Sequence, residues 1–176
     1  MVKQGWFIGI GSNIEPSTNM PLTLQLLLTH FPQIHSSAAI QTPPVGMNSC
    51  NHFINLVVYL ECHLQEPELV YLLKNIEEDM GRPRNIKNRK LIDRTADLDP
   101  LCYVAAPVDS GDNTLRIPRE VYLNGPFLEL AVYLKLLPPH TPIPPFKRIA
   151  LANNLFGQKA TTIYRHRTAG HKRIIE

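Results

Sequence analysis

Asp97-Leu98-Asp99 is the part of this sequence whose residue types and spacing most directly suggest chemistry. If these residues lie on a β-strand, both aspartate side chains project from the same face, about 7 Å apart. Two carboxylates held that close repel each other unless a cation lies beside them, and Mg²⁺ suits the position because it combines carboxylates with water and phosphate oxygens. A pair of solvent-facing acids on an edge strand is the alternative, and the tripeptide alone does not decide between the two.

The thirteen residues from 82 to 94 carry six cations directly upstream of the aspartates. Such a run is usually a solvated surface, but beside a metal site it supplies what phosphoryl transfer needs, because arginines neutralise charge on the transferred group. The sequence has no GxxxxGK[ST] motif, which excludes a P-loop enzyme, and Gly9 and Gly11 lack the third glycine of a Rossmann fingerprint. The six cations are Arg82, Arg84, Lys87, Arg89, Lys90 and Arg94.

A second group of residues is suited to a flat, hydrogen-bonding ligand. The segment Thr42-Pro43-Pro44-Val45-Gly46 has a backbone fixed by its two prolines. Phe53 and Asn55 follow, two residues apart on an apolar strand, so they share a face and offer an aromatic plane and a bidentate amide. The alternative is that Phe53 belongs to the core and Asn55 is a satisfied buried amide.

Hydrophobic periodicity predicts the elements that would position these residues. Their order of strand, helix, strand, strand, helix, strand is typical of an α+β, ferredoxin-like βαββαβ sheet with helices packed on one face. Pro100 implies that the last strand lies at an edge or contains a bulge. The predicted strands are 6–12, 33–41, 53–62 and 96–104, with a short partner at 116–118, and the predicted helices are 19–31, 66–80 and 126–137.

The composition bounds the class of protein. The chain has 176 residues, 44% of them apolar, which predicts one catalytic domain over residues 1–137 and a Pro-rich and basic C-terminal extension over 138–176, whose tail after Thr161 is expected to be loose. A net charge of +3 does not favour a nucleic-acid binder. Three widely spaced cysteines and the lack of a signal peptide or an apolar membrane span predict a cytoplasmic protein that binds no membrane.

The sequence resembles the 6-hydroxymethyl-7,8-dihydropterin pyrophosphokinase family in the order and near spacing of its motifs, over roughly residues 5–130. The resemblance implies a ferredoxin-like, ATP-dependent diphosphotransferase of folate biosynthesis that transfers pyrophosphate from ATP to a reduced pterin and gives AMP. The motifs that carry it are Gly11-Ser12-Asn13, Thr42-Pro43-Pro44-Val45-Gly46, Phe53-Ile54-Asn55, Glu77, Gly81-Arg82-x-Arg84 and Arg94-Thr95-x-Asp97-Leu98-Asp99.

The resemblance also implies roles for individual residues. Asp97 and Asp99 would hold two Mg²⁺ ions and, with Arg82 and Arg94, would form the catalytic set. The implied ATP contacts are Glu77, Arg82, Arg84 and Arg94, and the implied pterin contacts are Thr42, Pro43, Val45, Phe53, Asn55 and Phe127.

Several positions depart from the family pattern. The tryptophan expected before Arg94 is missing, and Lys90-Leu91-Ile92-Asp93 stands there. A Pro-His-Tyr segment that contacts ATP reads Pro118-Arg119-Glu120, and Gly125 replaces an arginine. These departures predict an altered grip on the adenine and triphosphate, while the metal and pterin residues are retained.

Two other functions are compatible with part of the sequence. A relative that binds a pterin or nucleotide, but has lost or changed the transfer step, is the first alternative. An RNA-binding module of similar fold is disfavoured, because no strand has the aromatic RNP-type pattern. The expected partners are ATP and a reduced pterin, the chain is expected to be a monomer, and no nucleic acid is expected to bind.

Overall fold

The computed structural model describes residues 4–82, 91–105, 115–151, 156–165 and 174–175, which form one mixed α+β unit with an antiparallel sheet. The helices and strands alternate in the predicted order through the first 104 residues. In chain order the elements are β1 (Gly5–Ser12), α1 (Pro16–His30), β2 (Gln33–Ser36), β3 (Ala39–Thr42), β4 (Phe53–Glu61), α2 (Glu66–Asp79), β5 (Asp97–Val104), the 3₁₀ turn η2 (Val121–Leu123), α3 (Asn124–Tyr133), β6 (Arg148–Ile149), β7 (Thr161–Arg165) and β8 (Ile174–Ile175).

The sheet has the strand order β5-β1-β4-β2-β7-β8, and β3 pairs with β4 and β6 beside this path. β1 and β4 lie side by side near its centre, are buried along nearly their whole length and pair over eight residues. The single strand predicted for 33–41 is divided into β2 and β3, since Ser37 and Ala38 interrupt it. Ser37 still donates its backbone N–H to the Val57 carbonyl at 2.8 Å, and its hydroxyl oxygen accepts the Val57 N–H at 2.9 Å.

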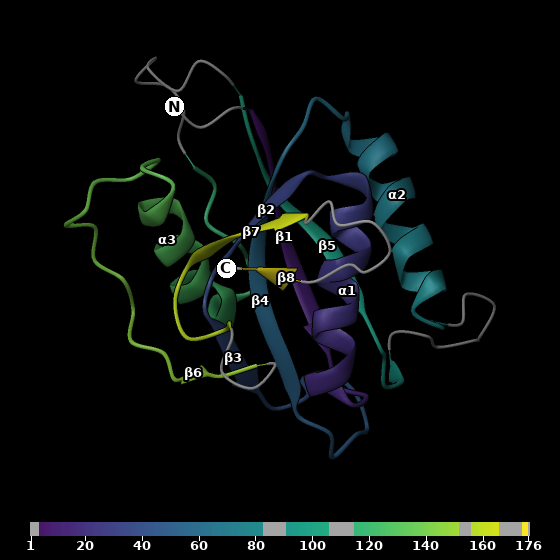
Figure 1. Ribbon diagram of the computed structural model, residues 1–176. Coiled ribbons are helices and arrows are strands. Elements are labelled where there is room, and N and C mark those ends of the chain that lie inside the picture. Colours follow the sequence, from purple (N-terminus) through teal and green to yellow (C-terminus); the bar gives the residue numbers. More distant parts are fainter. Residues whose placement is uncertain (1–3, 83–90, 106–114, 152–155, 166–173, 176) are drawn as a thin grey trace.

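Both faces of the sheet are covered by helices, which corrects the prediction that the helices pack on one face. α1 and α2 lie on one face, as predicted, and α3 lies on the other (Figure 1). The reason is the alternation along the central strands. Ile8 and Leu56 point into the core beneath α1 and α2, whereas Phe7, Tyr59 and Val57 point into a second core with α3.

The helix boundaries show how local chemistry sets each start. α2 begins as predicted, with Glu68 accepting the backbone N–H of Gln65 at 2.9 Å in a capping box. The predicted start of the first helix at residue 19 is three residues too late. α1 begins at Pro16, and Glu15 precedes it in the left-handed region with φ of 39°.

The C-terminal part of the chain adds strands to the same sheet. β6 pairs with β3, and β7 pairs with β2 over four residues, so the prediction of a loose tail after Thr161 is wrong for 161–165. The predicted strand at 116–118 is also wrong, because these residues form no ladder. Pro100 was expected to mark an edge strand or a bulge, and both are found. β5 lies at the edge of the sheet, and its register with β1 shifts beside this proline.

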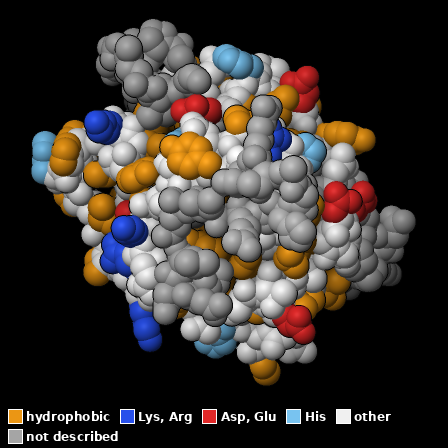
Figure 2. All heavy atoms as spheres, in the orientation of Figure 1, with side chains coloured by type: hydrophobic (Ala, Val, Ile, Leu, Met, Phe, Trp, Pro, Cys, Tyr) orange, Lys and Arg blue, Asp and Glu red, His pale blue; other side chains and the backbone are white. Residues whose placement is uncertain are grey.

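The described surface is chemically mixed. On the face drawn in Figure 2, the coloured basic side chains are separated by apolar and acidic ones and form no continuous basic surface. Among the described residues, no helix has the length and apolar character needed to cross a membrane.

Candidate active site

Two glycines of β1 leave the sheet bare beside the two aspartates. In the antiparallel register Gly11 is opposite Asp97 and Gly9 is opposite Asp99, so all four residues belong to the face that α3 covers. Leu98, between the aspartates, is buried in the other core. The two carboxylates therefore share one face, as a strand at this position predicts, and the missing side chains of the glycines let Asn55 and Leu123 approach the sheet beside them.

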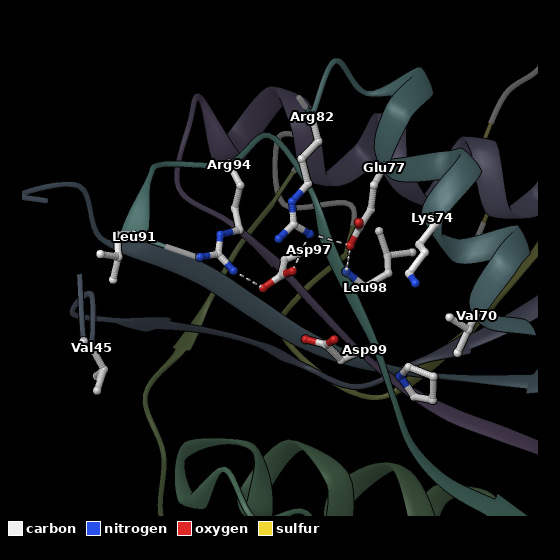
Figure 3. A pocket seen from close by; sticks show the side chains of 12 residues that line it. Val45, Val70, Lys74, Glu77, Arg82, Leu91, Arg94, Asp97, Leu98 and Asp99 are labelled. Atoms are coloured by element: carbon white, nitrogen blue, oxygen red, sulfur yellow. Dashed lines mark hydrogen bonds and ion pairs between the residues drawn. The ribbon is translucent and has the colours of Figure 1, made fainter. Parts of the chain in front are cut away.

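A cluster of acids and arginines surrounds Asp97 (Figure 3). One guanidinium nitrogen of Arg82, Nη1, donates to Glu77 Oε1 and to Asp97 Oδ1, both at 2.5 Å. Arg94 Nη1 donates to the other oxygen of Asp97, Oδ2, at 2.6 Å. Both oxygens of Asp97 are thus engaged by arginines, and Asp97 is the centre of a three-residue ion-pair chain between the end of α2 and the start of β5.

Glu77 connects α2 to β5 through the same cluster. Its Oε1 also accepts the backbone N–H of Leu98 at 2.9 Å. Burial raises the pKa of Glu77, and this hydrogen bond and the charge of Arg82 oppose the rise. The charged form of this carboxylate is therefore stabilised first by the Leu98 N–H and next by Arg82.

Within the described part of the chain, Asp99 is the carboxylate of this group that forms no ion pair with an arginine, and it is exposed on the cavity wall. Its pKa is raised, first by desolvation from the surrounding protein and next by the neighbouring charge of Asp97. Arg82 and Arg94 pull that pKa back down, whereas Glu120 adds to the rise. A cation placed beside Asp99 would relieve both causes of the shift.

These side chains open into a cavity of about 650 Å³, large enough for part of a nucleotide. Lys74, one turn before Glu77 on α2, also faces this cavity and was missed from sequence, although their three-residue spacing places both on one helix face. The lining residues are Val45, Gly46, Val70, Lys74, Glu77, Arg82, Leu91, Arg94, Asp97, Leu98, Asp99 and Pro100. We call Glu77, Arg82, Arg94, Asp97 and Asp99 the charged half of the site.

Neutral residues of β3 and β4 lie beside the charged half. Asn55 is buried and donates from Nδ2 to Thr42 Oγ1 at 2.8 Å, across the β3–β4 pair. A Cβ at Gly11 would lie only 2.7 Å from Asn55 Oδ1, so the glycine is what gives this amide its place. Phe53 shares the face of Asn55, and we call Thr42, Phe53 and Asn55 the neutral half.

The two halves meet at Phe53. The guanidinium carbon of Arg94 lies 5.8 Å from the centroid of the Phe53 ring, within the range of a cation–π contact. Arg94 therefore contacts Asp97 on one side and the aromatic residue of the neutral half on the other.

The remaining predicted site residues differ in their exposure to solvent and in their distance from the charged and neutral halves. Val45 is 79% exposed on the wall of the cavity, and Pro43 lies beside it in the same exposed segment. Phe127 is fully buried in the core with α3 and stacks on Phe7 with 4.6 Å between ring centroids. Arg84 lies outside the described residues.

Gly125, the position where the family pattern has an arginine, lies against the ring of Phe146 from the C-terminal extension. A side chain at Gly125 would collide with this ring. The guanidinium carbon of Arg148 lies over the same ring, 4.4 Å from its centroid, and Arg148 pairs with Glu129 of α3 at 3.1 Å. The extension thus fills the space that a longer residue at 125 would need.

The donor set of the charged half fits a magnesium ion better than a softer metal. Asp97 and Asp99 supply carboxylate oxygens on one strand face, and the described residues hold no cluster of three or more histidine, cysteine or acidic residues arranged to bind a metal. Mg²⁺ tolerates such a site because it takes one or two carboxylates and completes its octahedron with water and phosphate oxygens.

Comparison with known proteins places this fold and site in a family. A model of the 7,8-dihydro-6-hydroxymethylpterin-pyrophosphokinase family matches residues 7–135, a span that includes every element from β1 to α3. The chain belongs to this family.

Individual relatives agree with the family assignment at modest identity, and each is named 2-amino-4-hydroxy-6-hydroxymethyldihydropteridine pyrophosphokinase. The protein from Bacillus subtilis is 28% identical over 130 residues, which cover 70% of this chain and 76% of the relative. The protein from Porphyromonas gingivalis is 26% identical over 144 residues, or 78% of this chain and 96% of the relative. The protein from Methylorubrum extorquens is 30% identical over 116 residues, which cover 64% of this chain and 70% of the relative.

Proposed function

We propose that this chain transfers the pyrophosphoryl group of ATP to 6-hydroxymethyl-7,8-dihydropterin, giving AMP and the pterin diphosphate in folate biosynthesis. The observation that carries the proposal is the joining of Arg82, Asp97 and Arg94 at a cavity beside the Asn55 amide. Family membership and the names of the relatives support the same reaction.

In this reaction the hydroxymethyl oxygen of the pterin attacks the β-phosphorus of ATP. The bond between that phosphorus and the oxygen bridging to the α-phosphate breaks, AMP leaves, and the hydroxyl proton is released. The charge that must be stabilised is spread over the whole triphosphate, which calls for several cations rather than one. Arg82 and Arg94 stand at the cavity wall for this purpose.

The ion pairs of the charged half suggest how substrate binding changes the site. While both arginines are paired with Asp97, each oxygen of this carboxylate is engaged by an arginine Nη1, and neither these oxygens nor the two Nη1 donors are available to a ligand. We infer that Arg82 and Arg94 move from Asp97 to phosphate oxygens when ATP binds, which frees Asp97 to join Asp99 as a metal ligand. Mg²⁺ bound there would supply Lewis-acid charge to phosphate oxygens, and two ions are expected.

The neutral half is proposed as the pterin pocket. Asn55 keeps Oδ1 as an acceptor because its Nδ2 is already committed to Thr42, so it can recognise an N–H edge of the pterin. Phe53 would stack on the ring, with Pro43 and Val45 at the rim. Phe127 would stack only after its ring leaves Phe7, so its direct contact depends on a shift of α3.

A non-catalytic relative is the second candidate, because Asp97 is already neutralised by two arginines and the ATP-side residues depart from the family pattern. The deciding experiment measures AMP formed from ATP with and without the pterin, in Mg²⁺ and in EDTA. AMP that requires both pterin and Mg²⁺ supports the transferase. Pterin binding by calorimetry without AMP would establish the non-catalytic binder instead.

We also infer that residues 1–137 form a ferredoxin-like catalytic domain and that 138–176 is a Pro-rich extension packed on it. The strand order β5-β1-β4-β2 with α1 and α2 on one face supports the first part. The pairing of β6 and β7 with β3 and β2 supports the second. Removal of the extension should then expose the outer edges of β2 and β3 and lower stability.

A further inference from the structure

A carboxylate outside the proposed catalytic set joins three separate loops beside the site. Asp93 Oδ1 accepts from Asn13 Nδ2 at 2.6 Å, and Asp93 Oδ2 accepts from Asn51 Nδ2 at 2.5 Å. Ser49 lies near the same carboxylate, and its influence, followed by the hydrogen bonds from Asn51 and Asn13, lowers the pKa of Asp93. We call Asn13, Ser49, Asn51 and Asp93 the Asp93 junction.

The junction is directly connected to the backbone of Arg94. Asn13 Oδ1 accepts the backbone N–H of Arg94 at 2.8 Å. The carbonyl of Arg94 accepts the backbone N–H groups of Asn13 at 3.1 Å and Ile14 at 3.3 Å. Both backbone polar groups of Arg94 are therefore held by the turn between β1 and α1, while its side chain is held by Asp97.

Asp93 decides which way the buried Asn13 amide faces. A carboxylate only accepts hydrogen bonds, so it must meet Nδ2 of Asn13, and this leaves Oδ1 directed at the Arg94 N–H. Without Asp93 the amide could reverse, and it would then present a donor to the Arg94 N–H. The anchor of Arg94 thus depends on the residue next to it in sequence.

Asn51 and Ser49 extend the junction to the other half of the site. Both belong to the segment between β3 and β4, and that segment leads directly to Phe53. Arg94 lies over the ring of Phe53. One carboxylate therefore fixes the mutual placement of the Arg94 segment and the loop that enters the neutral half.

We propose that Asp93 is a positioning residue, which holds Arg94 at Asp97 and Phe53 by tying its segment to the β1–α1 turn and to the β3–β4 segment. Asp93 itself is not among the residues that line the cavity. The importance of Arg94 for turnover rests on the proposed function, whereas the tie between the segments does not.

The test combines kinetics with amide hydrogen exchange on the full chain. Asp93→Ala should lower kcat about 10- to 100-fold, because displacement of a reacting-site cation by about 1 Å costs rate on that scale. In an Arg94→Ala background the same substitution should change kcat by less than about twofold, since the group that Asp93 positions is already gone. Asp79→Ala, which removes an exposed aspartate at the end of α2, is the matched control.

The exchange measurement separates this proposal from the proposed function. Asp93→Ala, but not Asp79→Ala, should speed exchange at the Arg94 amide and across 49–53, even if the wild-type chain makes no AMP. Asn51→Ala removes one exposed arm of the junction, and it should give a smaller effect of the same kind if Asp93→Ala does not fold. Equal kinetic losses with and without Arg94, or unchanged exchange at both segments, would overturn the proposal.

Discussion

The charged and neutral halves of the candidate site are built in opposite ways. The charged half comes from one stretch of chain, from Glu77 at the end of α2 to Asp99 on β5, and its members other than Asp99 form ion pairs with one another. The neutral half is assembled from β1, β3 and β4, and depends on strand register and on the absence of a side chain at Gly11. Ion pairs hold the charged half together, whereas strand register and close packing hold the neutral half together.

This difference has consequences for binding. Ion pairs can exchange partners, so the charged half is able to receive a triphosphate and cations without moving the backbone. A close-packed amide cannot exchange its neighbours without loss of a buried hydrogen bond. We therefore expect the neutral half to be preformed and the charged half to rearrange, and each prediction below tests one side of that contrast.

Asp97→Ala should have the largest effect. It removes the proposed metal ligand and leaves Arg82 and Arg94 without their shared partner. Mg²⁺-dependent AMP formation should fall by about 10²- to 10³-fold or more. Pterin affinity, measured by calorimetry, should stay within about twofold, because Asp97 does not contact the Thr42–Asn55 pair. Unchanged turnover would remove Asp97 from the metal site.

Gly11→Ala should damage the neutral half selectively. The new methyl group would lie 2.7 Å from Asn55 Oδ1, so the amide must move and its hydrogen bond to Thr42 is strained. Loss of a buried hydrogen bond of about 1–2 kcal/mol corresponds to a roughly 10-fold weaker pterin Kd.

Gly9→Ala is the matched control on the same strand and face. Its methyl group would meet only the side-chain ends of Leu123 at 3.2 Å and Leu101 at 3.4 Å, which can shift. If Gly9→Ala weakened pterin binding as much as Gly11→Ala does, the close packing around Asn55 would not be what sets the pterin affinity.

The Mg²⁺ requirement should depend on pH through Asp99. Its raised pKa means that protonation begins at higher pH than for an ordinary aspartate, and a protonated carboxyl is a poor metal ligand. The Mg²⁺ concentration for half-maximal rate should therefore rise as pH falls, while pterin Kd changes less. Asp99→Asn should need more Mg²⁺ throughout and lose this pH dependence. A pH dependence that persists in Asp99→Asn would assign it to another group, with Glu77 as the next candidate.

The sequence was sufficient to find the charged half but not its pairing. Asp97 and Asp99 share a face because strand periodicity requires it, and their nearness in sequence to Arg82 and Arg94 made an encounter expected. Two features depend on how the end of α2 meets β5. Both arginines engage the same aspartate, and Asp99 is left with a raised pKa. This is a tertiary contact that no local pattern encodes.

The neutral half and the second helical layer were less predictable. The collision between a Gly11 side chain and Asn55 follows from the β1–β4 register, which is a long-range property. Phe127 was predicted to line the pterin pocket. In the structure it lies on the apolar face of α3 and packs against Phe7 in the core. β6 and β7 were missed because two- and five-residue polar strands carry almost no periodic signal.

Phe146→Ala should have the smallest effect and should fall on the neutral half alone. The ring lies against Gly125 at the first turn of α3 and under Arg148, and it is only partly buried, so its loss should cost about 1–2 kcal/mol of unfolding free energy, below the range for a fully buried phenylalanine. Because α3 carries Phe127, pterin affinity should weaken a few-fold, which is consistent with the coupling typical of neighbouring groups. The Mg²⁺ requirement should not change, since Phe146 is not among the residues that line the cavity of the charged half. Denaturant unfolding and Mg²⁺ titration of the same variant check both statements, and a shifted Mg²⁺ requirement would show that the two halves are coupled through α3.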